Sequence, residues 1–423
     1  GIGTYIKASS ERHADADDRS NDHIRINAED VGARIIGEGA NLGMTQAARV
    51  AFALRGGRVN TDAIDNSAGV DSSDQEVNIK ILCLEAIRQG TLVASNRDDL
   101  LASMTDEVAA HVLKHNYDQT HALSLAETQA PMDHDAYERL MCLLESRDRL
   151  DRDVEGLPGT AQMQERQDNG QFLTRPEIAV LMAWSKITLF DDLIASSVPD
   201  DPFFADALMA YFPAPICHQS EALTTHPLKR EIIATILSNK SIDLGGPVLV
   251  MRLTEECNAS PGQVVKALET AGALIGREQL EDAINHLDNH IATEVQLHLK
   301  QTLASGTAAL AATLLNGPEM DRVGDVILKY EAGFRRLRSH LPDCLTPQHL
   351  EDLEKAKQLH AAQGVPSSLS VDLADLAVYA NLPALAEIAT KAQATLEDVF
   401  GAFETTGAAL GTEDLSRIAT AVL

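Results

Sequence analysis

The sequence predicts a mostly helical protein in which an α/β remnant is followed by a large all-α region. Residues 33–37 and 59–64 are short β-type runs, and each is followed by a polar loop and then by apolar residues at helical spacing. This order of strand, loop and helix is typical of a parallel sheet. Beyond about residue 95 the helical spacing persists. We therefore place the α/β remnant at residues 1–95 and the all-helical region at 96–423, with a possible subdivision near 240–262.

Two helices are predicted within the α/β remnant. The first spans residues 45–54 and ends at the Gly56-Gly57 turn. The second opens in the polar loop at 66–73 and continues through Ile87. Because two strands are too few for a stable open sheet, we expect the other strands to lie upstream of Gly1, in a longer protein.

The all-helical region carries recognisable helix boundaries. Thr174 is the expected N-cap of one helix, with Pro176 just inside it and Glu177 in its first turn. Residues 279–315 predict a nearly continuous helix that is broken near Gly306. Five or so helices should follow, with breaks at 345–347, 364–366, 382–383 and 411–412.

The composition bears on partners and compartment. The formal net charge is -28, from 35 basic and 63 acidic residues. Binding to nucleic acids or anionic membranes is favoured by clustered Lys and Arg, so we expect neither as a partner of this acidic chain. No apolar run reaches the roughly 20 residues of a membrane span. The five cysteines are scattered, odd in number and without CxxC spacing. Reduced thiols in a cytoplasmic protein fit this pattern best.

The sequence gives no convincing metal site. His111 and His115 share a helical face, and His286 and His290 repeat the spacing, but neither pair has a third ligand or an HExxH pattern. A surface or packed pair is the better interpretation of both. The acidic run at 15–18 lacks the glycine turn and terminal Glu of a calcium loop. We therefore assign no metal-binding residue.

Two polar loops, at 38–45 and 66–76, are the most informative feature of the chain. Open α/β sheets bind ligands in the crevice where loops follow strands. Gly39 permits a close approach of the backbone to a ligand. The side chains of Asn41 and Asn66 are amides that donate and accept hydrogen bonds at once. The alternative is that these loops are ordinary turns.

A carboxylate site is predicted where the second loop enters its helix. Ser72 and Ser73 are placed at the expected helix start, where unsatisfied backbone N–H groups and the positive end of the helix dipole favour an anion. Their hydroxyls could hold a carboxylate together with the adjoining amides. The alternative is that Asp71, Ser72 or Ser73 simply caps its own helix.

Both loops carry a family resemblance. Residues 38–41, Glu-Gly-Ala-Asn, resemble the EGAN segment of glutamate dehydrogenases, and residues 66–76 resemble their NAGGVxxSxxE segment. Longer stretches resemble the large bacterial NAD-specific class of these enzymes, namely residues 1–9, 60–71, 172–181 and 226–235. The helical remainder looks like the carboxyl-terminal domain of the same proteins.

The resemblance implies a fold, an activity and binding residues. Residues 1–95 would be the carboxyl-terminal part of a Rossmann-like dinucleotide-binding domain. The cofactor would be NAD, and the reaction would be oxidative deamination of L-glutamate to 2-oxoglutarate and ammonia. The implied cofactor-binding residues are Gly3, Thr4, Gly39, Ala40, Asn41 and Asn66, and the implied substrate-binding residues are Ser73 and Asn66. The full-length protein would be a homo-oligomer.

The sequence also departs from the family pattern. Gly43-Met44 replaces the Pro-Thr of the small enzymes, and Ser67 and Ala68 replace the Ala and first Gly of NAGG. The phosphate-binding glycine turn, the catalytic lysine and the catalytic aspartate are expected upstream of Gly1. We therefore assign no catalytic residue here and expect no turnover from the chain alone. The alternative function is a non-catalytic helical assembly or regulatory module that carries an incomplete half-site.

Overall fold

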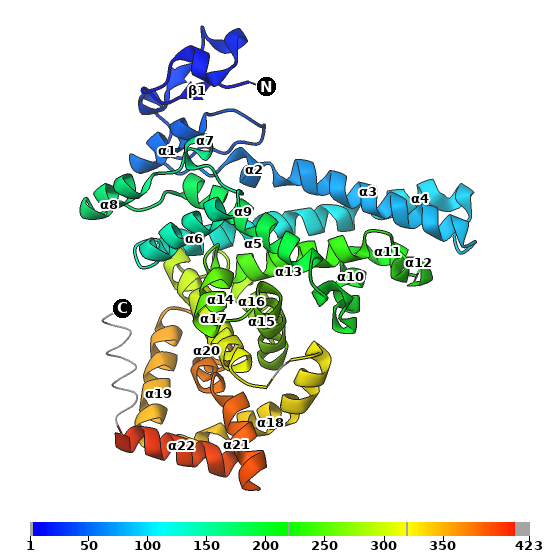
Figure 1. The fold of residues 1–423 in the computed structure, drawn as a ribbon, viewed down its shortest axis with the longest axis vertical. Coiled ribbons are helices and arrows are strands. Elements are labelled where there is room, and N and C mark those ends of the chain that lie inside the picture. Colours follow the sequence, from blue (N-terminus) through cyan, green and yellow to red (C-terminus); the bar gives the residue numbers. More distant parts are fainter. Residues whose placement is uncertain (1–2, 219, 319, 411–423) are drawn as a thin grey trace. The chain divides into compact units, whose positions relative to one another are not determined.

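The computed structural model describes residues 3–218, 220–318 and 320–410. The chain separates into two compact units, Gly1–Arg252 and Leu253–Leu423, each with its own internal contacts. The prediction of a mostly helical protein is confirmed, as the ribbon in Figure 1 shows. The predicted domain boundary near residue 95 stays a prediction.

The first unit begins with a small parallel arrangement of extended segments. β1 (Ile6–Lys7) pairs in parallel with β2 (Ile26–Asn27), and Ile6 also forms a parallel bridge with Met44. Three short 3-10 helices surround these strands: η1 (His13–Ala16), η2 (Arg19–Asn21) and η3 (Ala28–Asp30). The helix α1 (Gln46–Leu54) covers a small core of Ala28, Met44, Ala48, Phe52 and Val59.

The two predicted strands are wrong. Within 33–37 only Ile35 pairs, through an isolated parallel bridge to Arg58. The second run instead enters a short helix, α2 (Asp62–Asp65), after Thr61 in extended conformation. Thr and Asp favour helix starts, and here they override the β-type pattern of the apolar residues around them.

Other elements of the first unit agree with their sequence signals. Thr45 caps α1, because its hydroxyl accepts a hydrogen bond from the N–H of Ala48 at 3.1 Å. The helix α9 (Arg175–Ile194) begins at Thr174 with a capping box formed with Glu177, as predicted. Three further helices matter for the site: α3 (Ser67–Arg88), α5 (Thr105–Gln129) and α13 (Lys229–Gly245).

These helices pack closely within the first unit. α3 lies along α5, and α5 packs on α9 and α13 (Figure 1). The remaining helices of this unit are shorter and complete its surface: η4 (Ala94–Asn96), α4 (Arg97–Ser103), α6 (His134–Ser146), α7 (Arg152–Glu155), α8 (Thr160–Asp168), η5 (Val198–Asp200), η6 (Pro202–Phe204), α10 (Ala205–Tyr211), α11 (Ala214–Cys217) and α12 (Ser220–Thr224).

The regular elements among the described residues of the second unit are all helices. α14 (Leu249–Cys257) runs across the boundary between the units and is followed by α15 (Pro261–Ile275), α16 (Arg277–Asn285), α17 (Thr293–Leu315), α18 (Val323–Cys344), α19 (Pro347–Ala362), α20 (Ser367–Tyr379), α21 (Leu382–Ala392) and α22 (Leu396–Leu410). The breaks after α18, α19 and α20 lie at or next to the predicted breaks at 345–347, 364–366 and 382–383. The break at 393–395, between α21 and α22, was not predicted. The predicted break at 411–412 lies outside the described residues.

The predicted break near Gly306 is wrong. α17 runs through Gly306 without interruption, and the gap lies between α16 and α17 instead. A Cβ atom added at Gly306 would lie 2.8 Å from the Cβ of Leu376 on α20. This glycine therefore permits a close approach of two helices rather than a turn.

No single helix in the described part of the chain has the length and apolar composition to cross a membrane. Ser367–Tyr379 and Leu382–Ala392 pass that test only as a pair, by length and composition, with a bend of 57° between them.

Candidate functional site

The structure brings the two predicted asparagines together. The Nδ2 of Asn66 donates a hydrogen bond to the Oδ1 of Asn41 at 2.9 Å. Asn41 is exposed in the first loop, and Asn66 is half-buried at the junction of α2 and α3. A primary amide has two donor hydrogens and an accepting oxygen, so this contact engages only part of each group. The two loops thus present one joint amide surface.

Carboxylates hold the backbone of the first loop. The N–H of Glu38 donates to Asp65 Oδ2 at 2.8 Å, and the N–H of Leu42 donates to Asp62 Oδ2 at 2.8 Å. The N–H of Met44 donates to Glu38 Oε1 at 3.0 Å. Hydrogen bonds from amides to ionised acceptors are stronger than those between neutral groups. Residues 38–44 are therefore fixed at three points.

Arg49 of α1 balances the charge of two of these carboxylates. Its Nε lies 2.5 Å from Glu38 Oε2 and its Nη2 lies 3.0 Å from Glu38 Oε1, a bidentate arrangement. Its Nη2 also lies 3.2 Å from Asp62 Oδ1. The side chains of Arg49 and Glu38 are only 7% and 4% exposed. A buried ion pair between Arg49 and Glu38 therefore anchors the start of the first loop.

The second loop is held by α5. The Nδ2 of Asn116 donates to the carbonyl of Ile64 and to the hydroxyl of Ser67, both at 2.8 Å. One residue earlier on α5, the Nδ1 of His115 lies 2.8 Å from Asp71 Oδ2. These contacts fix the junction on either side of Asn66.

The predicted helix start at Ser72 and Ser73 is wrong. α3 begins at Ser67, and Asn116 stabilises that start from a neighbouring helix. The backbone N–H groups of Ser72 and Ser73 therefore lie inside the helix, where they bond to carbonyls four residues earlier. The Ser73 hydroxyl is exposed and donates to the carbonyl of Val70 at 2.7 Å. Its assignment to a substrate carboxylate stays a prediction that rests on the family resemblance and on the hydroxyl, without the support of a helix start.

The other predicted cofactor residues differ in their surroundings. No atom lies within 4 Å of a Cβ added at Gly39, so the space beside that residue is open, and Ala40 beside it is half-buried. Thr4 is only 6% exposed; its N–H donates to Asp18 and its carbonyl accepts from Arg25, both at 2.8 Å. The roles of Gly3 and Thr4 in cofactor binding stay predictions.

The residues that hold the two loops in place were not predicted from the sequence. Arg49, Asp62, Asp65 and Asn116 carry most of the contacts described above. One signal was available: Asp62 and Asp65 lie within the stretch 60–71 that resembles the family. Nothing local in the sequence marks Arg49 or Asn116, because the residues of the two loops that they contact lie at least 11 positions away.

The His115–Asp71 contact predicts a pH-dependent stability. The hydrogen bond to Asp71 raises the pKa of His115, assisted by the charges of Asp118 on α5 and Asp243 on α13 and opposed by partial burial. A raised pKa means that the stabilisation is complete below about pH 6.5, the usual His pKa, and is lost as the pH rises through the folded-state value.

We expect His115→Gln to reduce the free energy of unfolding at pH 6 more than at pH 8.5. The difference should be below about 1 kcal/mol, because the imidazole is half-exposed. Urea unfolding at the two pH values measures it, with His111→Gln as the control on the same helix face. An equal loss at both pH values would contradict the assigned charge interaction.

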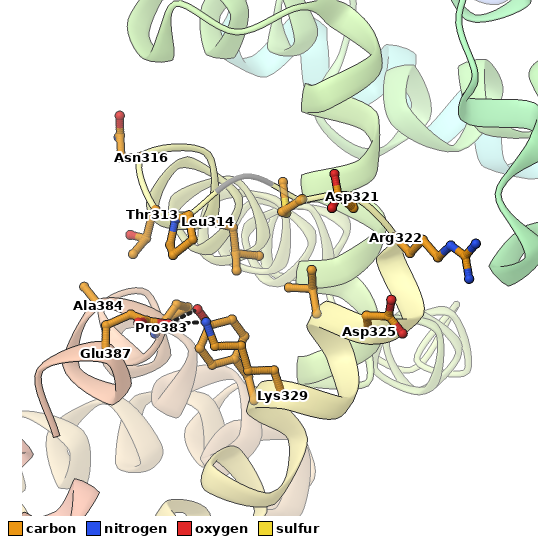
Figure 2. A pocket seen from close by; sticks show the side chains of 15 residues that line it. Thr313, Leu314, Asn316, Asp321, Arg322, Asp325, Lys329, Pro383, Ala384 and Glu387 are labelled. Carbon is orange, nitrogen blue, oxygen red and sulfur yellow. Dashed lines mark hydrogen bonds and ion pairs between the residues drawn. The ribbon is translucent and has the colours of Figure 1, made fainter. Parts of the chain in front are cut away.

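A separate cavity of about 370 Å³ lies in the second unit. It is lined by the end of α17, the segment that follows it, the first turns of α18 and the first half of α21, and includes Leu314, Arg322, Lys329, Tyr330 and Glu387. Figure 2 shows Lys329 and Glu387 directed toward each other, while Arg322 points away from them. The hydroxyl of Tyr330 also donates to Glu387 at 2.9 Å. None of the predicted site residues lines this cavity.

Within the described residues, no group of three or more His, Cys, Asp or Glu side chains is placed to hold a metal ion. His115 pairs with Asp71, and His286, which directly follows α16, contacts the carbonyl of Asp282 in that helix.

Comparison with known proteins identifies the family. Residues 170–422 match the family model for the carboxyl-terminal region of glutamate dehydrogenase, and residues 1–126 match that for the catalytic domain of bacterial NAD-glutamate dehydrogenase. Three similar curated proteins are each named NAD-specific glutamate dehydrogenase. The one from Pseudomonas aeruginosa is 43% identical over 304 residues, which is 72% of this chain and 19% of the relative.

Two further relatives extend over more of the chain. The protein from Mycobacterium tuberculosis is 38% identical over 377 residues, and that from Halomonas elongata is 36% identical over 375 residues. Each alignment covers 88% of this chain and 23% of the relative. The chain thus spans about a fifth of the length of the curated relatives it matches. The resemblance read from the two loops is confirmed, and the chain belongs to the glutamate dehydrogenase family, in its bacterial NAD-specific class.

Proposed function

We propose that this chain is part of an NAD-dependent glutamate dehydrogenase that oxidatively deaminates L-glutamate to 2-oxoglutarate and ammonia. The observation that carries the proposal is the 2.9 Å contact between Asn41 and Asn66, which joins the two family motifs into one amide surface. The names of the similar proteins support the same activity and cofactor. The work we assign to this chain is binding and orientation.

The described residues fit the nicotinamide end of NAD. Amide side chains match the mixed donors and acceptors of a carboxamide and a ribose, and the open space beside Gly39 lets a ligand approach the backbone. NAD, when bound, would accept the hydride, and Asn41 and Asn66 would orient the ring that receives it. The hydroxyl of Ser73 would hold the side-chain carboxylate of glutamate.

The same proposal covers the fold and the setting. We infer that residues 1–95 are the end of a Rossmann-like domain, and the parallel pairing of β1 with β2 and the parallel bridges at Met44 and Ile35 support this. The five free cysteines support a reducing, cytoplasmic compartment. A homo-oligomeric intact enzyme rests on the family resemblance.

Ser73→Ala in the intact enzyme tests the substrate assignment. We expect the KM for glutamate to rise roughly tenfold or more, because a hydrogen bond to a charged group contributes about 1.5–3 kcal/mol. The KM for NAD should change little. Steady-state kinetics with glutamate and NAD varied separately measure both constants.

Ser72→Ala is the matched control, since Ser72 is also exposed and is adjacent on the same helix. An unchanged KM for glutamate in Ser73→Ala would remove Ser73 from the site. If the unmodified intact enzyme formed no NADH from glutamate, the dehydrogenase proposal itself would fail and the non-catalytic helical module would replace it.

A further inference from the structure

We propose that Arg175, at the start of α9, is a positioning residue for the loop that carries Asn41. The proposal rests on the proposed function, because it assigns that loop to NAD. Arg175 lies in the stretch 172–181, which resembles the family. This stretch is separate from the two motif loops at 38–45 and 66–76. Its contacts reach Glu38, the first residue of the loop, through two intermediate side chains.

The first link joins α9 to Asn60. The Nε of Arg175 donates to Asn60 Oδ1 at 2.9 Å. The Nη1 of the same guanidinium donates to Ser124 and Glu127 of α5, at 3.0 and 2.9 Å. The Arg175 side chain is only 11% exposed. Because two nitrogens of the guanidinium, Nε and Nη1, are engaged by different partners, the direction of Nε toward Asn60 is fixed.

The second link joins Asn60 to the loop. The Nδ2 of Asn60 donates to Asp65 Oδ1 at 2.7 Å, and Asp65 Oδ2 accepts the N–H of Glu38 at 2.8 Å. Asn60 therefore accepts from Arg175 and donates to Asp65, which an amide can do and a carboxylate or an amine cannot. We call these three side chains the Arg175–Asn60–Asp65 network.

A second route leads from α9 to the same residue. The carbonyl of Pro176 accepts from Gln46 Nε2 at 3.2 Å, and Gln46 Oε1 accepts from Arg49 Nη1 at 3.2 Å. Arg49 then holds the carboxylate of Glu38. The start of α9 is thus connected to the backbone of Glu38 by one route and to its side chain by the other.

The start of α9 is itself firmly held. Glu177 is fully buried and accepts from the N–H and the hydroxyl of Thr174, at 2.8 and 2.6 Å. The Nη1 of Arg166 also donates to both carboxylate oxygens of Glu177, to Oε1 at 2.8 Å and to Oε2 at 3.0 Å. A capping box fixed by a buried charge pair gives Arg175 a rigid base. The motif around Thr174 therefore has a role beyond beginning a helix.

Two variants interrupt the network at different points. Arg175→Lys keeps a positive charge for Glu127, but a single ammonium cannot reproduce the fork that also reaches Asn60. Asn60→Leu keeps the shape of the side chain and removes both of its hydrogen bonds. Arg58→Lys is the matched control: Arg58 also contacts Glu127, at 3.1 Å, and is 64% exposed, whereas Arg175 is the arginine that donates to Asn60.

Hydrogen exchange tests the network in the chain itself, without any activity. We expect the amide of Glu38 to exchange roughly tenfold faster in Arg175→Lys and in Asn60→Leu, and at the unmodified rate in Arg58→Lys. In the intact enzyme, the two network variants should raise the KM for NAD roughly tenfold and the KM for glutamate by less than about threefold. The reason is that Asn41 lies in the held loop, whereas Ser73 lies on α3, which α5 holds.

The exchange rates and the KM values test the network, the positioning role and the proposed function separately. Glu38 exchange that matches the control in both network variants would overturn the proposal. Faster exchange without a selective rise in the KM for NAD would overturn the positioning role as well. If the unmodified intact enzyme failed to reduce NAD with glutamate, the proposed function would fall, and the exchange rates would still decide whether Arg175 holds the loop.

Discussion

Arg49→Met should destabilise the first unit by about 3–5 kcal/mol, because removing one partner of a buried ion pair leaves the other charge buried and unpaired. Glu38 is the group left behind, with a side chain that is 4% exposed. Asp62, which is 18% exposed, loses the same partner. Methionine fills a similar volume, so the loss should report the charge rather than a cavity.

The measurement is urea unfolding followed by tryptophan fluorescence. Trp184 is the single tryptophan of the chain and lies in α9 of the first unit, so its emission follows the unit that contains the loops. Arg88→Met is the control, since Arg88 is 80% exposed and pairs with Glu85 on the same helix. That change should cost no more than about 0.5 kcal/mol.

A double variant shows whether the charge is responsible. Glu38→Gln removes the carboxylate charge but keeps an oxygen that can accept from the N–H of Met44. Combined with Arg49→Met, it should recover at least about 1 kcal/mol of the loss. A loss below about 1 kcal/mol in Arg49→Met alone would show that the pair does not hold the loop as described.

The sequence predicted the parts of this fold that depend on local signals. Thr45 and the Thr174–Glu177 pair are helix starts with short-range hydrogen bonds, and both are found where expected. The polar loops and their asparagines were found by motif, and the contact of Asn41 with Asn66 agrees with the joint role that the resemblance implies.

The parts that the sequence did not predict depend on contacts between distant residues. Ser72 and Ser73 imitate a helix cap, but the real start at Ser67 is stabilised by Asn116, which is 49 positions away. Gly306 imitates a helix break, but its role is to admit Leu376 of another helix. In each case the local residue type is compatible with two structures, and tertiary packing selects one of them.

The candidate site contains residues of two kinds, which differ in how visible they are in the sequence. A motif marks residues that are expected to face a ligand, and we propose this role for Asn41 and Asn66. The groups that hold the loops, such as Asp65 and Arg175, act on backbone amides and on one another. Their residue types are common on any protein surface, so only the folded arrangement distinguishes them.

In the second unit, Arg277→Met should also cost about 3–5 kcal/mol of unfolding free energy. The Nη2 of Arg277 lies 2.9 Å from Glu269 Oε1, and the two side chains are 5% and 9% exposed. The guanidinium lies against Gly272 of α15, where an added Cβ would be 3.1 Å from its Cζ. Without Arg277, the Glu269 carboxylate would be left in an apolar environment.

Glu38 accepts a backbone N–H from Met44 in addition to its contacts with Arg49, whereas the contact described for Glu269 is the one with Arg277. In addition, Nε and Nη1 of Arg277 have no hydrogen-bond acceptor among the described residues, so the buried guanidinium is incompletely satisfied. Replacing both partners should therefore be nearly neutral: Arg277→Met with Glu269→Leu should recover most of the loss.

Far-UV circular dichroism during urea unfolding measures each variant, with Glu281→Gln as the control, since Glu281 is one-third exposed and lies 3.6 Å from Arg277. A double variant as unstable as Arg277→Met alone would show that α15 and α16 need this ion pair for their packing and not only for charge balance.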